Sequence, residues 1–234
     1  MIKTLLIGVT AGVFFTLIGC GTSRVSSTYM VDTTPVKTYA PPPKTIQVKS
    51  IAVIPFKDKT TNSPIKGDVG SMAVDQLITL LVNTERFTVV DRERLDAILA
   101  EQGLAGKGIV DDATAAKIHK VLGAELIFTG AVTNWEVKEA KTGTYVLVGG
   151  GANKAIDIDL AVDGRIIDAT TSQIYCADSG EIKRREEVSK TAILSFAPDG
   201  YIKLDQSVAG KQLRLALNEM LSKIIPVVDR KFSQ

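Results

Sequence analysis

The stretch from Val48 to Val132 alternates between two kinds of apolar pattern, and this alternation restricts the fold more than any other feature of the chain. Short runs rich in β-branched residues predict strands at residues 50–56, 87–90 and 125–132. Apolar residues at helical spacing predict helices at residues 69–83, 92–103 and 113–122. The resulting order, βαβααβ, indicates a layered α/β domain in which helices pack on a sheet.

Capping residues mark the ends of these predicted helices. Three aspartates are placed to accept hydrogen bonds from the free amide groups of a first turn: Asp68, Asp91 and Asp112. Three residues stand at the expected ends: Asn83, Gly103 and Gly123. An apolar stripe between Val208 and Ile224 predicts a last helix, which we expect to stop before Pro226 because proline has no backbone donor.

The second half of the chain is dominated by strand patterns. Residues 156–162 place apolar side chains at every second position, which is the clearest period of two in the sequence. Residues 166–169 and 173–177 predict a hairpin, and Asp163-Gly164 predicts a turn or a bulge. We therefore expect a mixed α/β (α+β) fold, a three-layer domain spanning residues 48–230.

The first twenty residues indicate a secretion signal. Lys3 precedes an uncharged apolar run of fifteen residues, 4–18, which is short for a membrane helix and typical of a signal peptide. The run ends in Leu17-Ile18-Gly19-Cys20, which resembles a bacterial lipobox. That resemblance implies removal of residues 1–19 and acylation of Cys20. An uncleaved anchor helix is the alternative.

An acylated Cys20 would hold the protein on a bilayer, because stable anchoring takes two membrane signals and this residue would carry several acyl chains. Residues 20–47 then predict a flexible tether, since they are rich in Ser, Thr and Pro and show neither period. By resemblance to other lipoproteins, the lack of Asp at Gly21 implies the periplasmic face of the outer membrane.

Composition excludes several classes of function. The chain has 28 basic and 26 acidic side chains, a formal net charge of +2, which argues against nucleic acid as a partner. One histidine and two cysteines are too few for most zinc sites or for catalysis by several histidines. We expect no metal, no cofactor and no catalytic residue, and hence not an enzyme. Cys176, in an apolar strand pattern, predicts a buried, inert thiol.

Four features have an enzymatic or binding interpretation and a simpler structural one, and the simpler one is favoured in each case. His119 lies between lysines and off the apolar face of its helix, which predicts a solvated surface histidine. Residues 149–151 are three glycines without the lysine and helix start of a phosphate loop. Asp157 and Asp159 fit the polar face of a strand, and residues 183–187 fit a solvated sheet edge.

Two long excursions separate the later strands, at about residues 133–155 and 183–205. Both contain strand patterns around turn residues, so we expect two inserted β-hairpins. Membrane strands carry aromatic residues near the interfaces. The candidates for such anchors are Trp135, Tyr145, Phe196 and Tyr201. Extended periplasmic hairpins are the alternative.

Five segments in this order, behind a lipobox, resemble the CsgG/HfaB family of bacterial lipoproteins: residues 50–56, 85–92, 95–104, 123–130 and 162–170. The resemblance implies a periplasmic α/β domain that assembles into a homo-oligomeric ring. It also implies that each subunit gives two hairpins to a shared outer-membrane β-barrel, which exports curli subunits or helps to attach holdfast. Secreted proteins and accessory envelope proteins are the implied partners.

In that family the loop after the first strand forms the constriction of the pore. The corresponding loop here is residues 57–67, and the candidates for the pore lining are Phe56, Thr60, Thr61 and Asn62. A second interpretation is a periplasmic adaptor without a pore, similar to the LpoB activators of peptidoglycan synthesis, which share the α/β domain and the Pro-rich tether.

Overall fold

The computed structural model describes residues 39–61, 63–65, 68–90, 95, 97, 100, 115, 118–120, 122–139, 154–188, 193–196, 202–204 and 206–233. All of them belong to one unit of the chain, Pro35–Gln234. The expected signal peptide, Cys20, Asn62, Tyr145, the glycines at 149–151 and Tyr201 lie outside the described residues.

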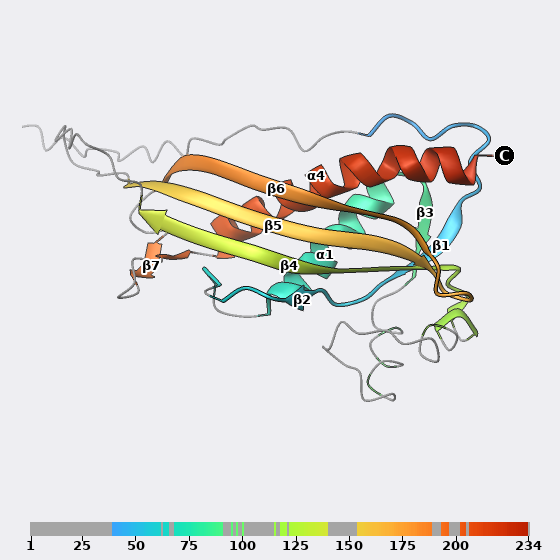
Figure 1. The fold of residues 1–234 in the computed structure, drawn as a ribbon, viewed down its shortest axis with the longest axis horizontal. Coiled ribbons are helices and arrows are strands. Elements are labelled where there is room, and N and C mark those ends of the chain that lie inside the picture. The colour runs from blue at the N-terminus through green and yellow to red at the C-terminus, as the bar shows by residue number, and fades with distance from the viewer. Residues whose placement is uncertain are drawn as a thin grey trace, which may run out of the picture. The chain divides into compact units, whose positions relative to one another are not determined.

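The main sheet has six strands in the order β3-β1-β4-β5-β6, with the short β2 beside β4 (Figure 1). Their bounds are β1 Lys49–Val53, β2 Lys57–Asp58, β3 Phe87–Val89, β4 Leu126–Glu139, β5 Lys154–Asp168 and β6 Ile174–Val188. β1 is parallel to β3 and to β4, whereas β4, β5 and β6 are antiparallel neighbours. The mixed α/β fold is therefore confirmed.

Helix α1, Val69–Asn83, begins and ends where its capping residues predict. The carboxylate of Asp68 accepts hydrogen bonds from the amide and the hydroxyl of Ser71, at 3.2 and 2.6 Å. Gly123 also has its predicted role. Its φ is +68°, and its amide donates to the carbonyl of His119 at 2.8 Å, which is how a glycine ends a helix.

Helix α4, Gln206–Phe232, does not stop before Pro226, so that expectation was wrong. Pro226 is exposed, and the carbonyl one turn earlier that loses its backbone donor can be hydrated there. The turns beyond the proline are held by the buried side chains of Val228 and Phe232. Packing thus outweighs the missing hydrogen bond.

The two faces of the sheet carry separate apolar clusters. On one face, Ile51 and Val53 of β1 pack with α1, α4 and the inward side chains of β4, β5 and β6. On the other face, Ala52 and Ile54 of β1 join a cluster that includes helical residues: Leu95, Ala115 and Ile118. β1 is therefore buried on both faces, as the central strand of a parallel arrangement usually is.

Strands β4, β5 and β6 are 14, 15 and 15 residues long, and both predicted excursions start from them (Figure 1). Residues 134–139 of β4 pair with residues 156–161 of β5, and residues 183–188 continue β6. Farther along, β7 (Ile193–Phe196) and β8 (Ile202–Leu204) form an antiparallel pair. The described parts of the excursions in β4, β5 and β6 thus extend the main sheet, whereas β7 and β8 form a separate two-stranded sheet.

The hairpin predicted across residues 170–172 joins β5 to β6. Asp163-Gly164 forms neither a turn nor a bulge, because β5 runs through it without a register shift. A Cβ on Gly164 would lie 2.5 Å from Sδ of Met220 and 2.8 Å from the Phe128 ring. Gly164 is needed because α4 packs closely on the sheet at this point. The sequence alone does not distinguish a glycine required for packing from a glycine required for a turn.

The last part of the predicted tether is bound to the domain, as the strap Tyr39–Gln47. The Tyr39 hydroxyl donates to Oδ1 of Asn218 on α4 at 2.6 Å, and burial raises the pKa of this phenol to about 12, against the opposing field of Arg86. At the other end, the Gln47 amide donates to the Phe232 carbonyl at 2.9 Å. Residues 39–47 of the expected tether, 20–47, therefore contact the domain.

Arg86 connects the strap, the start of β3 and α4. Its side chain is 2% exposed and binds the Asp229 carboxylate through Nε and Nη2, at 2.6 and 2.8 Å. Nη1 donates to the backbone carbonyls of Ala40 and Thr84, at 3.1 and 2.7 Å. A buried guanidinium is tolerated because its donors are engaged by a carboxylate and two carbonyls.

Replacing Arg86 by Met should lower the free energy of unfolding by about 3 kcal/mol, because the change leaves the Asp229 carboxylate without its partner. The control is Lys223→Met on the same helix, whose exposed pair with Glu219 is expected to contribute less than about 1 kcal/mol. Urea unfolding followed by circular dichroism measures both variants. Equal losses in the two variants would contradict a special role for Arg86.

Candidate functional site

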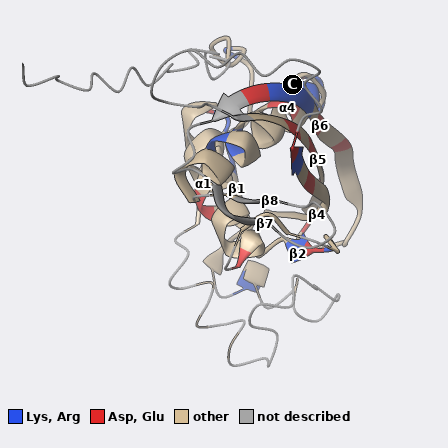
Figure 2. Ribbon diagram, turned by 90° about the vertical axis from the view of Figure 1, so that its left-hand side faces the viewer, with Lys and Arg blue, Asp and Glu red and all other residues tan. Residues whose placement is uncertain are grey.

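The face of β4, β5 and β6 that points away from α4 is the candidate functional surface, and we call it the open face. Along β5, inward residues such as Leu160 and Val162 are buried, whereas Asp159 and Asp163 on the other face are polar. The distal part of the open face carries six charged residues: Glu136, Lys138, Asp157, Asp159, Lys183 and Arg185. Figure 2, seen from the end of the sheet, shows charged residues on β5 and β6.

Two pairs of these charges join neighbouring strands, and a third pair lies within β4. Arg185 binds Asp157 through two hydrogen bonds, of 2.7 and 2.9 Å, from the position directly opposite in the sheet. The hydrogen bond from Arg185 lowers the pKa of Asp157 below its usual value. Lys183 lies 3.8 Å from Asp159, and Lys138 lies 2.8 Å from Glu136. The interpretation of Asp157 and Asp159 as the polar face of a strand is thus confirmed.

A hollow of about 660 Å³ lies on the same face, closer to β2. The basic residues that line it are Lys57, Lys59 and Arg165, and the acidic residues are Asp163 and Asp178. Its floor consists of short side chains from β4 and β6, such as Ala131 and Ala177. The hollow and the paired charges make the open face polar from the hollow to the distal end of the strands, whereas Ile127 and Ile167, at the other end of the same face, are buried in an apolar cluster.

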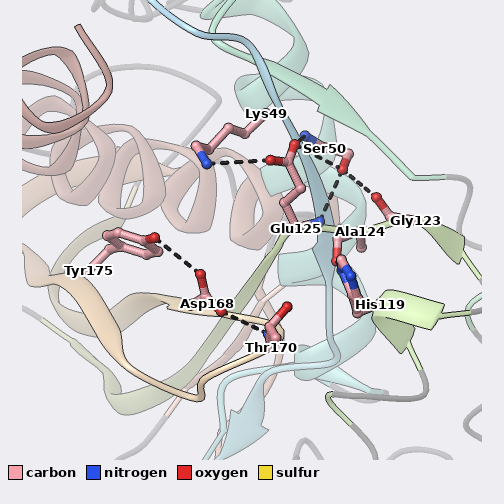
Figure 3. A network of polar contacts seen from close by, with 9 residues as sticks. All are labelled: Lys49, Ser50, His119, Gly123, Ala124, Glu125, Asp168, Thr170 and Tyr175. Carbon is pink, nitrogen blue, oxygen red and sulfur yellow. Dashed lines mark hydrogen bonds and ion pairs between the residues drawn. The ribbon is translucent and has the colours of Figure 1, made fainter. Parts of the chain in front are cut away.

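A second set of polar contacts ties the start of β1 to the start of β4 (Figure 3). The Ser50 hydroxyl donates to the Gly123 carbonyl at 2.6 Å and accepts from the Glu125 amide at 3.0 Å. Lys49 lies 3.3 Å from the Glu125 carboxylate. Nδ1 of His119 lies 2.9 Å from the Ala124 carbonyl. Ser50 and His119 both bind backbone groups, so the arrangement holds strands together and does not resemble an activated nucleophile.

His119 differs from its prediction. The residue is half-buried and contacts the turn after its own helix, so it is not the solvated surface histidine expected from the flanking lysines. The contact brings the ring next to a chain reversal at Gly123. The apolar pattern of the helix predicts only that His119 points away from the core, and it does not predict a contact with the Ala124 carbonyl.

Asp168 organises the turn between β5 and β6 (Figure 3). Burial acts to raise the pKa of its carboxyl, but hydrogen bonds from the Thr171 and Thr170 amides and the Tyr175 hydroxyl outweigh burial and lower it. These bonds measure 2.7, 2.8 and 3.1 Å. The carboxylate therefore stabilises a tight turn, as aspartate commonly does.

Cys176 is a buried free thiol, as the sequence predicts. Burial raises its pKa, so little of it is thiolate near neutral pH. No cluster of three metal-ligating side chains occurs among the described residues. Within the same part of the chain, none of the helices is long and apolar enough to cross a membrane.

Of the residues expected to line a constriction, Phe56 is buried in the core, whereas Thr60 and Thr61 lie in the loop that follows β2. Phe56 is 2% exposed and stacks on Phe128 with ring centroids 6.2 Å apart, so it belongs to the core and does not line a channel in this structure. Its burial depends on Gly130, where a Cβ would lie 2.6 Å from the Phe56 ring. Thr60 donates its amide and hydroxyl to the Asp58 carboxylate at 2.8 and 2.6 Å, and Thr61 is exposed.

Trp135 was expected at a membrane interface, but it is 1% exposed inside the core. A register shift between Val132 and Asn134 changes the phase of β4, so that Trp135 and Val137 face α4. Phe196 lies in β7, opposite Ile202. The sequence signal for the shift was the spacing of three between Val132 and Trp135, which breaks a strict alternation.

The family model for the curli production assembly/transport component CsgG matches residues 36–232. Among curated proteins, the provisionally named lipoprotein NMB1126/NMB1164 of Neisseria meningitidis is 28% identical over 163 residues, which cover 69% of this chain and 66% of that protein. The match thus spans slightly less than two thirds of the relative's length.

Two matches among solved structures have TM-scores below 0.5. Lipoprotein GNA1162 from Neisseria meningitidis is 14% identical, with a TM-score of 0.43, and the match covers 78% of this chain and 99% of that one. The C-terminal domain of LpoB from Salmonella enterica is 16% identical, with a TM-score of 0.40, covering 58% of this chain and 83% of that one.

Trp135 is the single tryptophan, so its fluorescence tests its placement directly. We expect a blue-shifted emission that acrylamide quenches only weakly, and no quenching by brominated acyl chains when the full chain is bound to vesicles. The Trp135→Phe variant gives the tyrosine background. Strong quenching by brominated lipid would show that Trp135 contacts the bilayer and would contradict its burial in the core.

Proposed function

The chain belongs to the CsgG family, and from this membership we propose that it is an outer-membrane lipoprotein whose copies form a ring for secretion or assembly of surface proteins. The family match, which covers residues 36–232 behind a lipobox, carries the proposal. Transport through such a ring is passive and requires no catalytic group. The expected partners are a secreted protein substrate and accessory envelope proteins.

Acylation of Cys20 supplies the membrane anchor in this proposal. Because residues 39–47 contact the domain, we propose that the tether lies within residues 21–38, a segment that, extended at about 3.1 Å per residue, would reach at most about 55 Å. That length allows the domain to stand off the bilayer on its periplasmic face. The contact of Tyr39 with Asn218 of α4 supports a tether that joins the domain near this helix.

The distal strands bear on how such a ring would enter a membrane. A barrel strand needs one face for water and one for lipid. The open face is charged, but the apolar face of β4, β5 and β6 is occupied by α4, whose Gln212 contacts Glu186 at 2.7 Å. We therefore propose that any membrane insertion of the two excursions, about 133–155 and 183–205, involves their outer parts or requires α4 to separate from them.

The same observation favours a second candidate function. A sheet whose apolar face is already covered by its own helix can work as a periplasmic adaptor without a pore, for example as an activator of peptidoglycan synthesis. In that case the open face is the surface that a partner protein would contact. The two candidates share the lipid anchor and differ in whether the assembled protein conducts ions.

The full acylated chain, extracted in detergent, should appear as rings in negative stain and conduct ions in planar bilayers. Replacing residues 140–153 by a short Gly-Ser linker should abolish conductance and leave the circular dichroism spectrum unchanged. A monomer without conductance would contradict the ring. Rings that never conduct, together with binding to a purified cell-wall synthase, would favour the adaptor.

Replacing Cys20 by Ser should abolish incorporation of labelled palmitate and move the protein from the membrane fraction to the soluble fraction, because no acyl chain remains to anchor it. The matched control is Cys176→Ser, which removes the other cysteine and should leave labelling and fractionation unchanged. Labelling that persists in the Cys20 variant would show that the lipid is attached elsewhere.

A further inference from the structure

The hollow on the open face has an unusual distribution of charge. Elsewhere on this face the basic residues have acidic partners, as Arg185 has Asp157 and Lys183 has Asp159. The basic residues of the hollow are Lys57, Lys59 and Arg165. They take part in none of the ion pairs formed among the described residues. Among the described residues, three cations and two acidic residues, Asp163 and Asp178, thus border one cavity, and Asp178 also lies 4.0 Å from Lys223.

The cavity exists because the residues of β4 and β6 on either side of Arg165 and Asp163 have short side chains. In one row Arg165 of β5 stands between Thr129 and Ala177. In the next row Asp163 stands between Ala131 and Ser179. The Arg165 and Asp163 side chains therefore project from the middle strand beside low neighbours, which leaves space of about 660 Å³ above them. This volume is within the range of small-molecule sites.

The two lysines reach the cavity from a fixed backbone. Lys57 lies opposite Ala131 in the parallel pairing of β2 with β4. The amide of Lys59 donates to the Val132 carbonyl at 2.9 Å, and Asp58 between them binds the Thr60 amide at 2.8 Å. Both lysines therefore lie on the β2 side of the hollow, with Arg165 on the β5 side.

We propose that this hollow binds an anionic saccharide, with the phosphate or carboxylate of the sugar paired to Lys57, Lys59 and Arg165. Among the described lining residues three are basic and two acidic, and one of the acidic residues, Asp178, is shared with Lys223 at 4.0 Å. This balance favours an anionic ligand, and charge-assisted hydrogen bonds from Arg and Lys are strong. Asp163 and the hydroxyls of Thr129 and Ser179 accept or exchange hydrogen bonds with sugar hydroxyls. The site is independent of the ring and of the pore.

The test is isothermal titration of the full chain in detergent with four probes: glucose 6-phosphate, glucuronate, glucose and inorganic phosphate. Binding of glucose 6-phosphate, glucuronate or both is expected, and which one binds identifies the acidic group. Glucose and inorganic phosphate should bind about tenfold more weakly, because glucose lacks the acidic group and inorganic phosphate lacks the sugar hydroxyls. Affinity should fall as sodium chloride is added.

Variants locate the site. Lys57→Ala and Arg165→Ala should each weaken binding by about tenfold, the loss expected for one charge-assisted hydrogen bond. The matched controls are Lys183→Ala and Arg185→Ala, which remove paired cations of the same face and should bind as the parent does. Thermal unfolding of each variant checks the fold.

Three outcomes would overturn the proposal. The first is no binding of either charged sugar at millimolar concentration by a folded chain. The second is equal binding of glucose, which would remove the role of the cations, or of inorganic phosphate, which would remove the role of the sugar. The third is equal loss of binding in the control variants.

Discussion

The Arg86 guanidinium lies under α4, where an unpaired charge would cost several kcal/mol. The hydrogen bonds of Arg86 join segments of the chain that are not connected by the backbone hydrogen bonds of a helix or a sheet. Asp229 comes from the last turns of α4, Ala40 from the strap, and Thr84 from the end of α1. Because α4 passes Pro226 to bring Asp229 to this place, the helix is long enough to lie along the whole sheet (Figure 1). The position of α4 in turn decides which face of β4, β5 and β6 is buried.

That choice separates the sheet into two chemically different sides. A one-residue change of register would exchange the buried and open faces, so the bulge between Val132 and Asn134 has a large effect. It turns Trp135 into the core and leaves polar side chains on the open face. The covered side supplies stability, and the open side is available for ligands or partners. In a lipid-anchored ring, the contacts between copies would have to use surfaces that α4 and the strap leave free.

The elements that the sequence predicts well are those set by local chemistry. The aspartate cap of α1, the positive φ of Gly123 and the hairpin between β5 and β6 all depend on a few neighbouring residues. The errors concern contacts between distant segments. Pro226, Phe56, Trp135 and His119 are each placed by packing or by a partner outside their own element. Asp163-Gly164 has the composition of a turn, but its glycine is required by Met220 on α4.

This distinction also explains why strand alternation could not settle how the protein meets a membrane. A strand in a membrane barrel and a strand in a half-buried soluble sheet both alternate apolar with polar residues. They differ in what covers the apolar face, lipid in one case and protein in the other. Here the apolar stripe of α4 matches that face closely enough that a Cβ on Gly180 would lie 2.0 Å from the Ala216 carbonyl oxygen. So close an approach of two backbones requires a glycine and indicates packing against a helix. Lipid chains adapt to a surface and do not require a glycine to approach it.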